Sequence, residues 1–330
     1  MKEASYYHRE EKGIRCELCP QNCLVHPGCK GFCRARVNEN GRLYTMNYAE
    51  ITGLALDPIE KKPLYHFYPG AMILSCGTFG CNLACPFCQN WEISQGQPET
   101  ERLSVDELTE AAACARKRGN IGVAFTYSEP GIWFEYVREA ATALKEAGLH
   151  TVMVSNGYLS PAPVSDLLPL IDAWNIDLKS IRPGFYRKVC KGKLEPVLET
   201  ISAAAGKVHL ELTTLIIPGL NDSEEELHEL SQWVARVNPE VPLHFSRYFP
   251  GYKMALEPTG EEALRLAYRI ARKYLKYVYI GNLGISGDGA DTACPDCGEI
   301  LIERQGYKTR SRMGDNTRCI KCGADIPVVM

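Results

Sequence analysis

The stretch SCGTFGCNLACPFCQNWEISQG, residues 75–96, decides the fold and the chemistry expected of this chain. It places Cys81, Cys85 and Cys88 in a C-x3-C-x2-C spacing, directly after a short apolar run that predicts a β-strand. Loops after the strands carry the active sites of α/β barrels, so these thiols are expected at a barrel mouth. Three thiolates would hold a 4Fe-4S cluster and leave its fourth iron open to a non-protein ligand. The alternatives are a structural zinc or a chance cysteine loop, although zinc sites usually close with a fourth ligand that this loop lacks.

From about residue 71 onward, short apolar runs alternate with amphipathic helical segments. Two helix starts carry capping residues, Ser104 with Glu107 and Thr259 with Glu262. Strands that alternate with helices predict a parallel sheet, because parallel connections need a crossover. About six such units, fewer than the eight of a closed barrel, predict an α/β fold with a partial (β/α)6 TIM-like barrel. The expected strands are 71–76, 121–127, 150–155, 173–178, 208–215, 242–247 and 277–281.

Length and composition fit a folded protein with accessory parts. The chain has 330 residues, more than the roughly 100–200 of one typical domain, and 45% of them are hydrophobic. A net charge of −3 gives no general attraction to phosphate backbones, so nucleic acid is not an expected partner. No apolar stretch approaches the roughly 20 residues that span a bilayer, and the first residues are too polar for a signal peptide. We therefore expect a cytoplasmic protein that does not associate with a membrane.

Cysteine distinguishes this chain from an ordinary α/β protein. Of 15 cysteines, five lie within 16–33, four within 76–88 and four within 294–322. Clusters of this kind in a cytosolic chain indicate metal ligation rather than disulfides. We therefore expect an N-terminal cysteine-rich cap over 1–70, a core barrel over 71–281 and a C-terminal module over 282–330.

The C-terminal cysteines form two C-x2-C-G knuckles. Four thiolates that converge tetrahedrally, with a glycine in each tight turn, predict a zinc-ribbon-like module. A rubredoxin-like iron or an auxiliary cluster on the same ligands is the alternative. The four residues are Cys294, Cys297, Cys319 and Cys322.

Motifs along nearly the whole chain carry a family resemblance. The chain resembles the radical SAM superfamily, whose signature is the C-x3-C-x2-C spacing with an aromatic residue, here Phe87, before the last cysteine. Within it the chain is similar to enzymes related to the activators of pyruvate formate-lyase, and more closely to the AmmeMemoRadiSam system radical SAM enzyme family. The other matching motifs are CELCPQNC, GFCRAR, DPIEKKPLYHFYPG, FTYSEP, SNGY, NIDLK, TTLIIPGLNDS, HFSRYFPGYKM, YVYIGN, CPDCG and CIKCG.

The resemblance implies reductive cleavage of S-adenosylmethionine. The open iron would chelate its amino and carboxylate groups, and an electron from the cluster would break its sulfonium C–S bond. The resulting 5'-deoxyadenosyl radical would abstract hydrogen from a small molecule or a partner protein. Iron-sulfur clusters reach potentials as low as about −700 mV, so a flavodoxin or ferredoxin-type donor is implied. The family also implies Memo-type and AMMECR-type proteins as partners.

The resemblance assigns cofactor contacts to polar residues at the strand ends. Glu129 corresponds to the acidic residue that holds the methionine ammonium, with capping of the next helix as the alternative. Lys179 would meet the carboxylate of S-adenosylmethionine with Asp177 nearby; a plain salt bridge is the alternative. Asn156 matches a cofactor-contacting position, but Asn-Gly is also a frequent turn. His244 is expected near the ribose or the methionine, or else as a core histidine.

The remaining cysteines divide into ligands and packing residues. Cys76 and Cys114 are expected as buried core thiols, and Cys29 is additional to the family pattern. Zinc and an auxiliary 4Fe-4S cluster are equal alternatives for the N-terminal group, because spacing alone does not separate them. The N-terminal residues that match the family's four-cysteine pattern are Cys16, Cys19, Cys23 and Cys33.

Three other functions stay open. One is activation of a glycyl radical enzyme, although known activators insert their extra clusters after the catalytic cysteines, whereas here the extra cysteines precede and follow the barrel. Another is RNA modification, which the charge balance disfavours. The last is a non-catalytic, metal-stabilised binding module.

Overall fold

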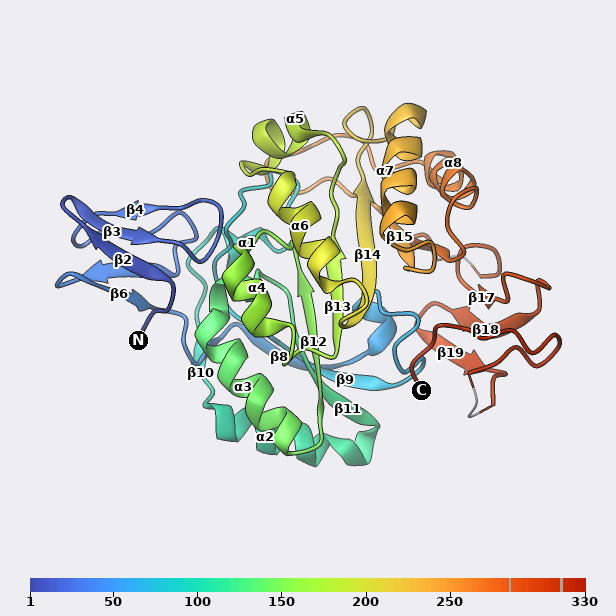
Figure 1. Cartoon of the computed structure of the whole chain (residues 1–330), viewed down its shortest axis with the longest axis horizontal. Helices are drawn as coiled ribbons and strands as arrows, with labels where there is room; N and C mark the ends of the chain where they lie inside the picture. Colours follow the sequence, from blue (N-terminus) through green and yellow to red (C-terminus); the bar gives the residue numbers. More distant parts are fainter. Residues whose placement is uncertain (285, 315–316) are drawn as a thin grey trace.

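The computed structural model describes residues 1–284, 286–314 and 317–330. Its centre is a sheet in the order β16-β15-β14-β13-β12-β11-β9-β8, whose strands from β9 to β16 are parallel. All seven expected strands are present, with helices in the crossovers between them (Figure 1). The α/β partial barrel is confirmed. The parallel strands are β9 (Met72–Gly77), β11 (Asn120–Phe125), β12 (His150–Ser155), β13 (Ala173–Asp177), β14 (His209–Ile216), β15 (Leu243–Arg247) and β16 (Val278–Gly281).

The helices pack their apolar faces on the sheet, as the 3.6-residue periodicity predicts. On α3, for example, Val137, Ala140 and Leu144 are fully buried. Among the described residues, no helix combines the length and the apolar character needed to cross a membrane. The helices are α1 (Trp91–Ser94), α2 (Val105–Cys114), α3 (Phe134–Glu146), α4 (Pro161–Leu167), α5 (Pro183–Phe185), α6 (Glu195–Ala204), α7 (Glu224–Val237) and α8 (Glu261–Ala271), with the short turns η1 (Ile59–Lys61), η2 (Ala115–Arg118), η3 (Pro130–Trp133) and η4 (Tyr186–Cys190).

The two predicted helix starts have different outcomes. At α2 the Ser104 hydroxyl accepts the N–H of Glu107, and the Glu107 carboxylate accepts the N–H of Ser104 at 2.7 Å, so the capping box is confirmed. At α8 the prediction is wrong, because the N-cap is Gly260. The Thr259 hydroxyl instead donates to the carbonyl of Ile216 at 2.6 Å and ties the loop after β15 to the end of β14.

Two smaller parts flank the barrel on opposite sides (Figure 1). The N-terminal part contains the antiparallel sheets β1-β6-β5 and β2-β3-β4 and the pair β7-β10; the C-terminal part is the sheet β17-β18-β19. One strand from the predicted cap region, β8 (Gly53–Pro58), instead joins the central sheet antiparallel to β9. The flanking strands are β1 (Lys2–Glu3), β2 (Tyr7–Glu10), β3 (Gly13–Cys16), β4 (Leu24–Val25), β5 (Arg36–Glu39), β6 (Arg42–Thr45), β7 (Glu50–Ile51), β10 (Glu101–Arg102), β17 (Thr292–Ala293), β18 (Ile300–Gln305) and β19 (Lys308–Ser311).

The end of the barrel opposite the strand C-termini is closed by two chain segments. The backbone of Tyr68 donates to the carbonyl of Val329, and that of Val329 donates to the carbonyl of His66, both at 2.8 Å. The buried Arg304 of β18 donates to the carbonyl of Tyr65 at 2.6 Å. The C-terminal part is therefore bound directly to the barrel floor.

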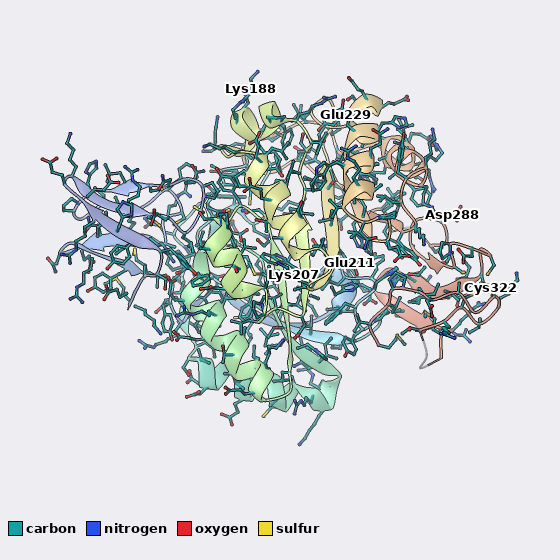
Figure 2. All side chains as sticks on the ribbon, viewed as in Figure 1. Lys188, Lys207, Glu211, Glu229, Asp288 and Cys322 are labelled. Carbon is teal, nitrogen blue, oxygen red and sulfur yellow. The ribbon has the colours of Figure 1, made fainter. Side chains whose placement is uncertain are left out.

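A buried carboxylate organises this floor. Glu211, on β14 inside the barrel (Figure 2), accepts the backbone N–H of His66 at 2.7 Å. It also pairs with the Nε2 atoms of His209 at 2.9 Å and His244 at 2.6 Å. Although burial opposes ionisation, the two histidines hold the pKa of Glu211 well below its usual range. The carboxylate is therefore the acceptor that joins the floor segment to two strands.

We expect Glu211→Ala to lower the free energy of unfolding at pH 7 by about 3–5 kcal/mol, because a buried network loses its central acceptor. The folded pKa lies below the unfolded value of about 4.3, so the contribution is present above that pH and is lost as the pH falls through the folded pKa. Denaturant unfolding at pH 7 and at progressively lower pH checks both effects. The exposed Glu110→Ala should change stability by less than about 0.5 kcal/mol. A cost below about 1 kcal/mol for Glu211→Ala contradicts this role.

Candidate active site at the barrel mouth

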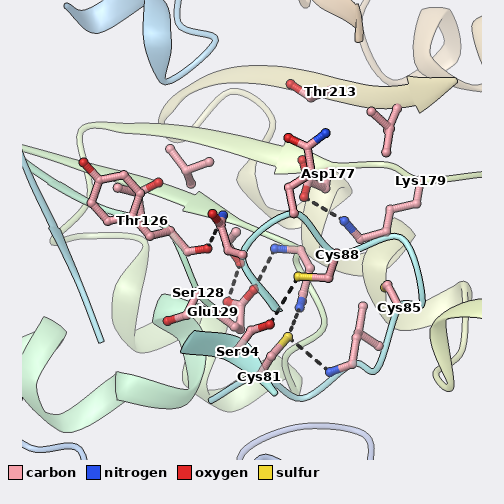
Figure 3. Close-up of a pocket in the computed structure, with 18 of the residues that line it drawn as sticks. Cys81, Cys85, Cys88, Ser94, Thr126, Ser128, Glu129, Asp177, Lys179 and Thr213 are labelled. Atoms are coloured by element: carbon pink, nitrogen blue, oxygen red, sulfur yellow. Dashed lines mark hydrogen bonds and ion pairs between the residues drawn. The ribbon is translucent and has the colours of Figure 1, made fainter. Parts of the chain in front are cut away.

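A cavity of about 460 Å³ lies at the C-terminal ends of the parallel strands (Figure 3). One wall is the loop after β9, and the other walls come from the ends of β11, β12, β13, β14 and β15. Eight of the nine residues predicted for the central site line this cavity. They are Cys81, Cys85, Phe87, Cys88, Glu129, Asn156, Asp177 and Lys179.

Cys81 and Cys88 receive polar contacts from their own loop, from α1 and from the residue after β12. Cys81 Sγ accepts the backbone N–H of Leu83 at 3.4 Å and the side-chain N–H of Asn156 at 3.6 Å. Cys88 Sγ lies 3.2 Å from the hydroxyl of Ser94. Burial raises the pKa of Cys81 and of Cys88, so metal binding here has to displace protons.

The sulfurs of Cys81, Cys85 and Cys88 are not gathered as closely as the ligands of a single zinc ion. Four thiolates on one zinc, with Zn–S bonds of about 2.3 Å, lie about 3.8 Å apart. In a 4Fe-4S cluster each thiolate binds a different iron, so the sulfurs lie farther apart. Within the described ranges, the central thiols are not part of any set of three ligand atoms that all lie within 4.8 Å of one another.

The four cysteines of the C-terminal group are as close together as the ligands of one zinc ion. Its four sulfurs all lie within 4.8 Å of one another, and the pairs Cys294–Cys322 and Cys297–Cys319 are 3.6 and 3.5 Å apart. Backbone N–H groups of Cys322 and Lys321 lower the pKa of Cys319 to about 6. The arrangement fits one tetrahedral ion.

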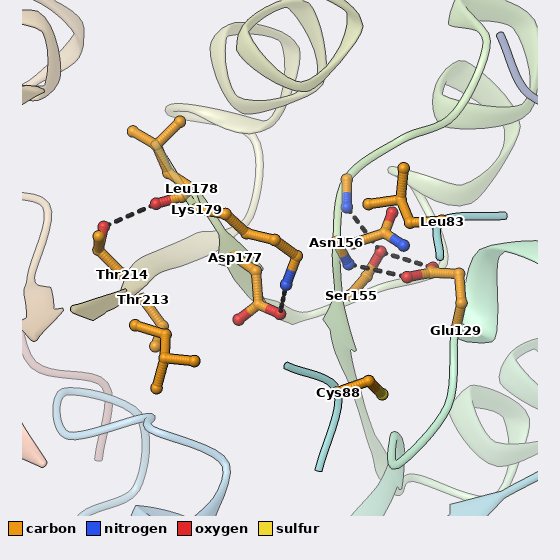
Figure 4. Close-up of polar contacts among 12 residues, drawn as sticks. Leu83, Cys88, Glu129, Ser155, Asn156, Asp177, Leu178, Lys179, Thr213 and Thr214 are labelled. Atoms are coloured by element: carbon orange, nitrogen blue, oxygen red, sulfur yellow. Dashed lines mark hydrogen bonds and ion pairs between the residues drawn. The ribbon is translucent and has the colours of Figure 1, made fainter. Parts of the chain in front are cut away.

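Glu129 is buried and already holds three donors, of which Ser155 and Asn156 are drawn in Figure 4. Its carboxylate accepts the N–H of Gly131 at 2.8 Å, the hydroxyl of Ser155 at 2.7 Å and the N–H of Asn156 at 2.8 Å. Burial nevertheless raises its pKa to about 7. Glu129 therefore caps η3, which is the alternative role predicted for it. A carboxylate has about four acceptor positions, so Glu129 keeps one for a ligand.

Asp177 and Lys179 form a salt bridge on the cavity wall. Lys179 Nζ lies 2.8 Å from Asp177 Oδ2 (Figure 4). Although burial opposes its charge, Asp177 and the thiols of Cys85 and Cys190 hold the pKa of Lys179 well above its usual value. The internal salt bridge that was predicted as the alternative is therefore present. Both residues also line the cavity, as binding of a cofactor there would require.

Asn156 lies at the cavity, whereas His244 lies outside it. The Asn156 side chain donates to Asn82 Oδ1 at 2.9 Å, and its backbone leads into a turn at Gly157 with φ +67°. His244 does not line the cavity; it stacks on Tyr279 at 5.1 Å between ring centroids and pairs with Glu211. The core-histidine alternative fits this position better than cofactor contact.

The cysteines that are not assigned as metal ligands differ in burial. Cys76 is fully buried at the end of β9, as predicted. The prediction for Cys114 is wrong, because its side chain is exposed at the last residue of α2. Cys190 was not predicted at the site: it is buried at the end of η4, and its hydrogen bond with Cys85, together with burial, raises the pKa of that ligand. No sequence spacing marks it, since the fold alone brings η4 to the loop.

Comparison with known proteins agrees with this geometry. Residues 76–231, which hold the three thiols and four of the strands that face them, match the model of the Radical SAM superfamily. The chain belongs to the radical SAM superfamily. It is 40% identical to the uncharacterized protein MJ0808 of Methanocaldococcus jannaschii over the full length of both chains.

Two characterised groups of radical SAM proteins are also similar. Biotin synthase of Parafrankia sp. is 30% identical over 65% of this chain and 64% of its own length. Pyruvate formate-lyase 1-activating enzyme of Escherichia coli is 25% identical over 56% of this chain and 76% of its own length. The structure of Streptococcus suis SuiB bound to S-adenosylmethionine superposes with a TM-score of 0.52 at 13% identity, over 64% of this chain and 52% of SuiB. At that identity the likeness concerns the fold alone.

Proposed function

We propose that this chain cleaves S-adenosylmethionine reductively and uses the resulting radical to abstract hydrogen from a small molecule or a partner protein. The observation that carries this proposal is the cavity. It joins three thiols to the buried carboxylate of Glu129 and the half-buried ammonium of Lys179 on the facing strands. Each of those charged groups has the opposite sign to one end of the methionine part of S-adenosylmethionine.

The residues of the cavity have separate tasks. A 4Fe-4S cluster held by Cys81, Cys85 and Cys88 would supply the electron that breaks the sulfonium C–S bond. Glu129 binds the amino group through its remaining acceptor position, and Ser155 and the Asn156 backbone keep its carboxylate oriented. Lys179 binds the carboxylate of the cofactor, and Asp177 stabilises the positive charge of Lys179.

A partner-protein substrate is supported by the rim of the cavity. Trp91 follows the lining residue Asn90, and its ring stacks on Tyr252 with centroids 5.1 Å apart. Trp91, Phe249 and Leu256 are all exposed, and aromatic residues are enriched where proteins bind one another. Similar proteins named as activating enzymes for pyruvate formate-lyase and benzylsuccinate synthase favour the same substrate class.

The narrower identity is part of the proposal. The motifs favour the AmmeMemoRadiSam family, with Memo-type and AMMECR-type partners, a flavodoxin or ferredoxin-type donor and a cytoplasmic location. We also propose that the compact C-terminal group binds a structural zinc ion, because its sulfur spacing is that of a tetrahedral site.

We expect Cys81→Ala, Cys85→Ala and Cys88→Ala each to abolish S-adenosylmethionine cleavage in anaerobically reconstituted protein, because each removes a ligand of the cluster. The melting temperature should stay close to wild type, since the barrel depends on strand and helix packing. Release of 5'-deoxyadenosine under dithionite measures cleavage. Turnover in any one variant, or none in the fully loaded wild type, would refute the proposed function.

Glu129→Gln should weaken binding of S-adenosylmethionine by about 10- to 150-fold, or about 1.5–3 kcal/mol, because a charged acceptor becomes neutral. Anaerobic titration calorimetry on the reconstituted protein measures the change. Glu92→Gln, which alters an exposed carboxylate on the neighbouring α1, is the matched control and should leave the affinity unchanged. Less than a threefold effect for Glu129→Gln would remove it from the binding site.

Replacing Cys294 and Cys322 together should release about one zinc ion per chain and lower the melting temperature, since the free energy of metal binding stabilises such small modules. Elemental analysis and thermal unfolding measure the two effects, and the absorbance of the central cluster should persist. Unchanged metal content in the double variant would show that these cysteines are free thiols.

A further inference from the structure

The four N-terminal thiols gather in one place although 16 residues separate the first from the last. Cys16 ends β3, Cys19 and Cys23 lie in the loop that follows, and Cys33 precedes β5. All four line a small cavity whose other walls include Arg36 and Ile132. Cys29, the additional cysteine of this region, is exposed and does not line the cavity.

Among the described residues, neither the N-terminal thiols nor the central thiols are gathered as closely as the C-terminal four. In the described part of the chain, the C-terminal set is the one group of three or more ligand atoms that all lie within 4.8 Å of one another. The N-terminal sulfurs surround a common cavity without converging in that way. This is the arrangement expected when each thiolate binds a different iron of a cluster.

The surroundings provide positive charge and N–H donors for an anionic group. Arg36 is 1% exposed, and its Nη1 lies 3.8 Å from Cys16 Sγ. Glu135 pairs with Arg36 at 2.6 Å, and among the described residues no group accepts a hydrogen bond from the buried Arg36 Nε. The backbone N–H of Phe32 donates to Cys23 Sγ at 3.4 Å. A buried arginine beside four thiols offsets the charge of a thiolate-bound centre.

This cavity abuts the loop that carries the central thiols. Gly80, the residue before Cys81, has φ +92°, and a Cβ atom there would lie 2.5 Å from the carbonyl oxygen of Cys33. Gln21, two residues after Cys19, donates to the carbonyl of Asn82 at 2.9 Å. The two sets of ligands are thus joined by direct contacts on both sides of Cys81.

We propose that Cys16, Cys19, Cys23 and Cys33 bind a second 4Fe-4S cluster, which passes electrons to the central one. A reduced flavodoxin or ferredoxin-type donor gives one electron to the second cluster, which returns to its oxidised form when that electron moves to the central cluster. Cys23 is partly exposed, so the second cluster lies near the surface where a donor docks. The electron transfer rests on the proposed function, whereas the metal assignment does not.

The metal content of the reconstituted full chain tests the assignment. Wild type should hold roughly eight irons, and Cys19→Ala with Cys33→Ala roughly four, with zinc unchanged. The exposed Cys29→Ala is the matched control and should keep the wild-type iron content. Zinc lost in place of iron, or no loss of iron, overturns the proposal.

A second variant covers the case in which the cap does not fold without its cluster. Replacing Cys81, Cys85 and Cys88 together leaves the N-terminal group intact and should retain roughly four irons. After reduction, its electron paramagnetic resonance signal should not respond to S-adenosylmethionine, whereas the wild-type signal should gain a component that does. If the variant that lacks Cys81, Cys85 and Cys88 holds no iron, the proposal of a second cluster is wrong.

The reductant separates electron transfer from a structural role. Loss of the second cluster should reduce the ratio of flavodoxin-driven to dithionite-driven cleavage by about tenfold or more, because the small chemical reductant does not need the docking route. Equal loss with both reductants overturns the electron-transfer role. Absence of cleavage in wild type that holds both clusters refutes the proposed function and leaves the metal assignment standing.

Discussion

The parallel register of the central sheet is the constraint on which the rest of this molecule depends. Each crossover returns the chain to the same edge, so every strand from β9 onward ends at one mouth. Residues as far apart in sequence as Cys81, Glu129 and Lys179 meet there without any local relationship. The opposite edge needs a different solution, and the floor around Glu211 supplies it by pairing one buried carboxylate with two histidines and a backbone N–H. One end of the barrel is thereby closed, and the other is free for chemistry.

The open end contains charges that the fold alone does not explain. Glu129 is buried with its pKa raised to about 7, and Lys179 is held charged beside Asp177. Both groups have partners within the protein and also line the cavity, so a ligand with separate positive and negative groups suits this cavity. Perturbed ionisable groups around a cleft are typical of functional sites, and the superfamily match makes S-adenosylmethionine the partner that fits.

The sequence predicted what depends on periodicity and spacing. The seven strands, the Ser104 cap and the mouth position of Cys81 follow from local patterns. What it missed depends on tertiary contact. Thr259 has the residue type of a helix cap, but its hydroxyl bonds Ile216 on a neighbouring strand. Cys190 has no partner at ligand spacing, yet η4 brings it to Cys85. Both outcomes are decided by distances across the fold, which no short window of sequence contains.

The three cysteine groups also show that sequence spacing alone does not separate one kind of metal site from another. Their sequence spacings all permit a metal, and spacing left zinc and a cluster as equal alternatives at the N-terminus. Our proposal rests on the separation of the sulfurs in space, because the thiolates of one ion lie close together, whereas each thiolate of a cluster binds a different iron. The C-terminal set is compact and lies across the barrel from the cap. The described N-terminal thiols do not converge in that way, and Cys33 lies against Gly80 in the loop that carries the central thiols. A metal that only stabilises a module can lie anywhere on the surface, but a centre that exchanges electrons has to lie beside its acceptor, and only the N-terminal group does.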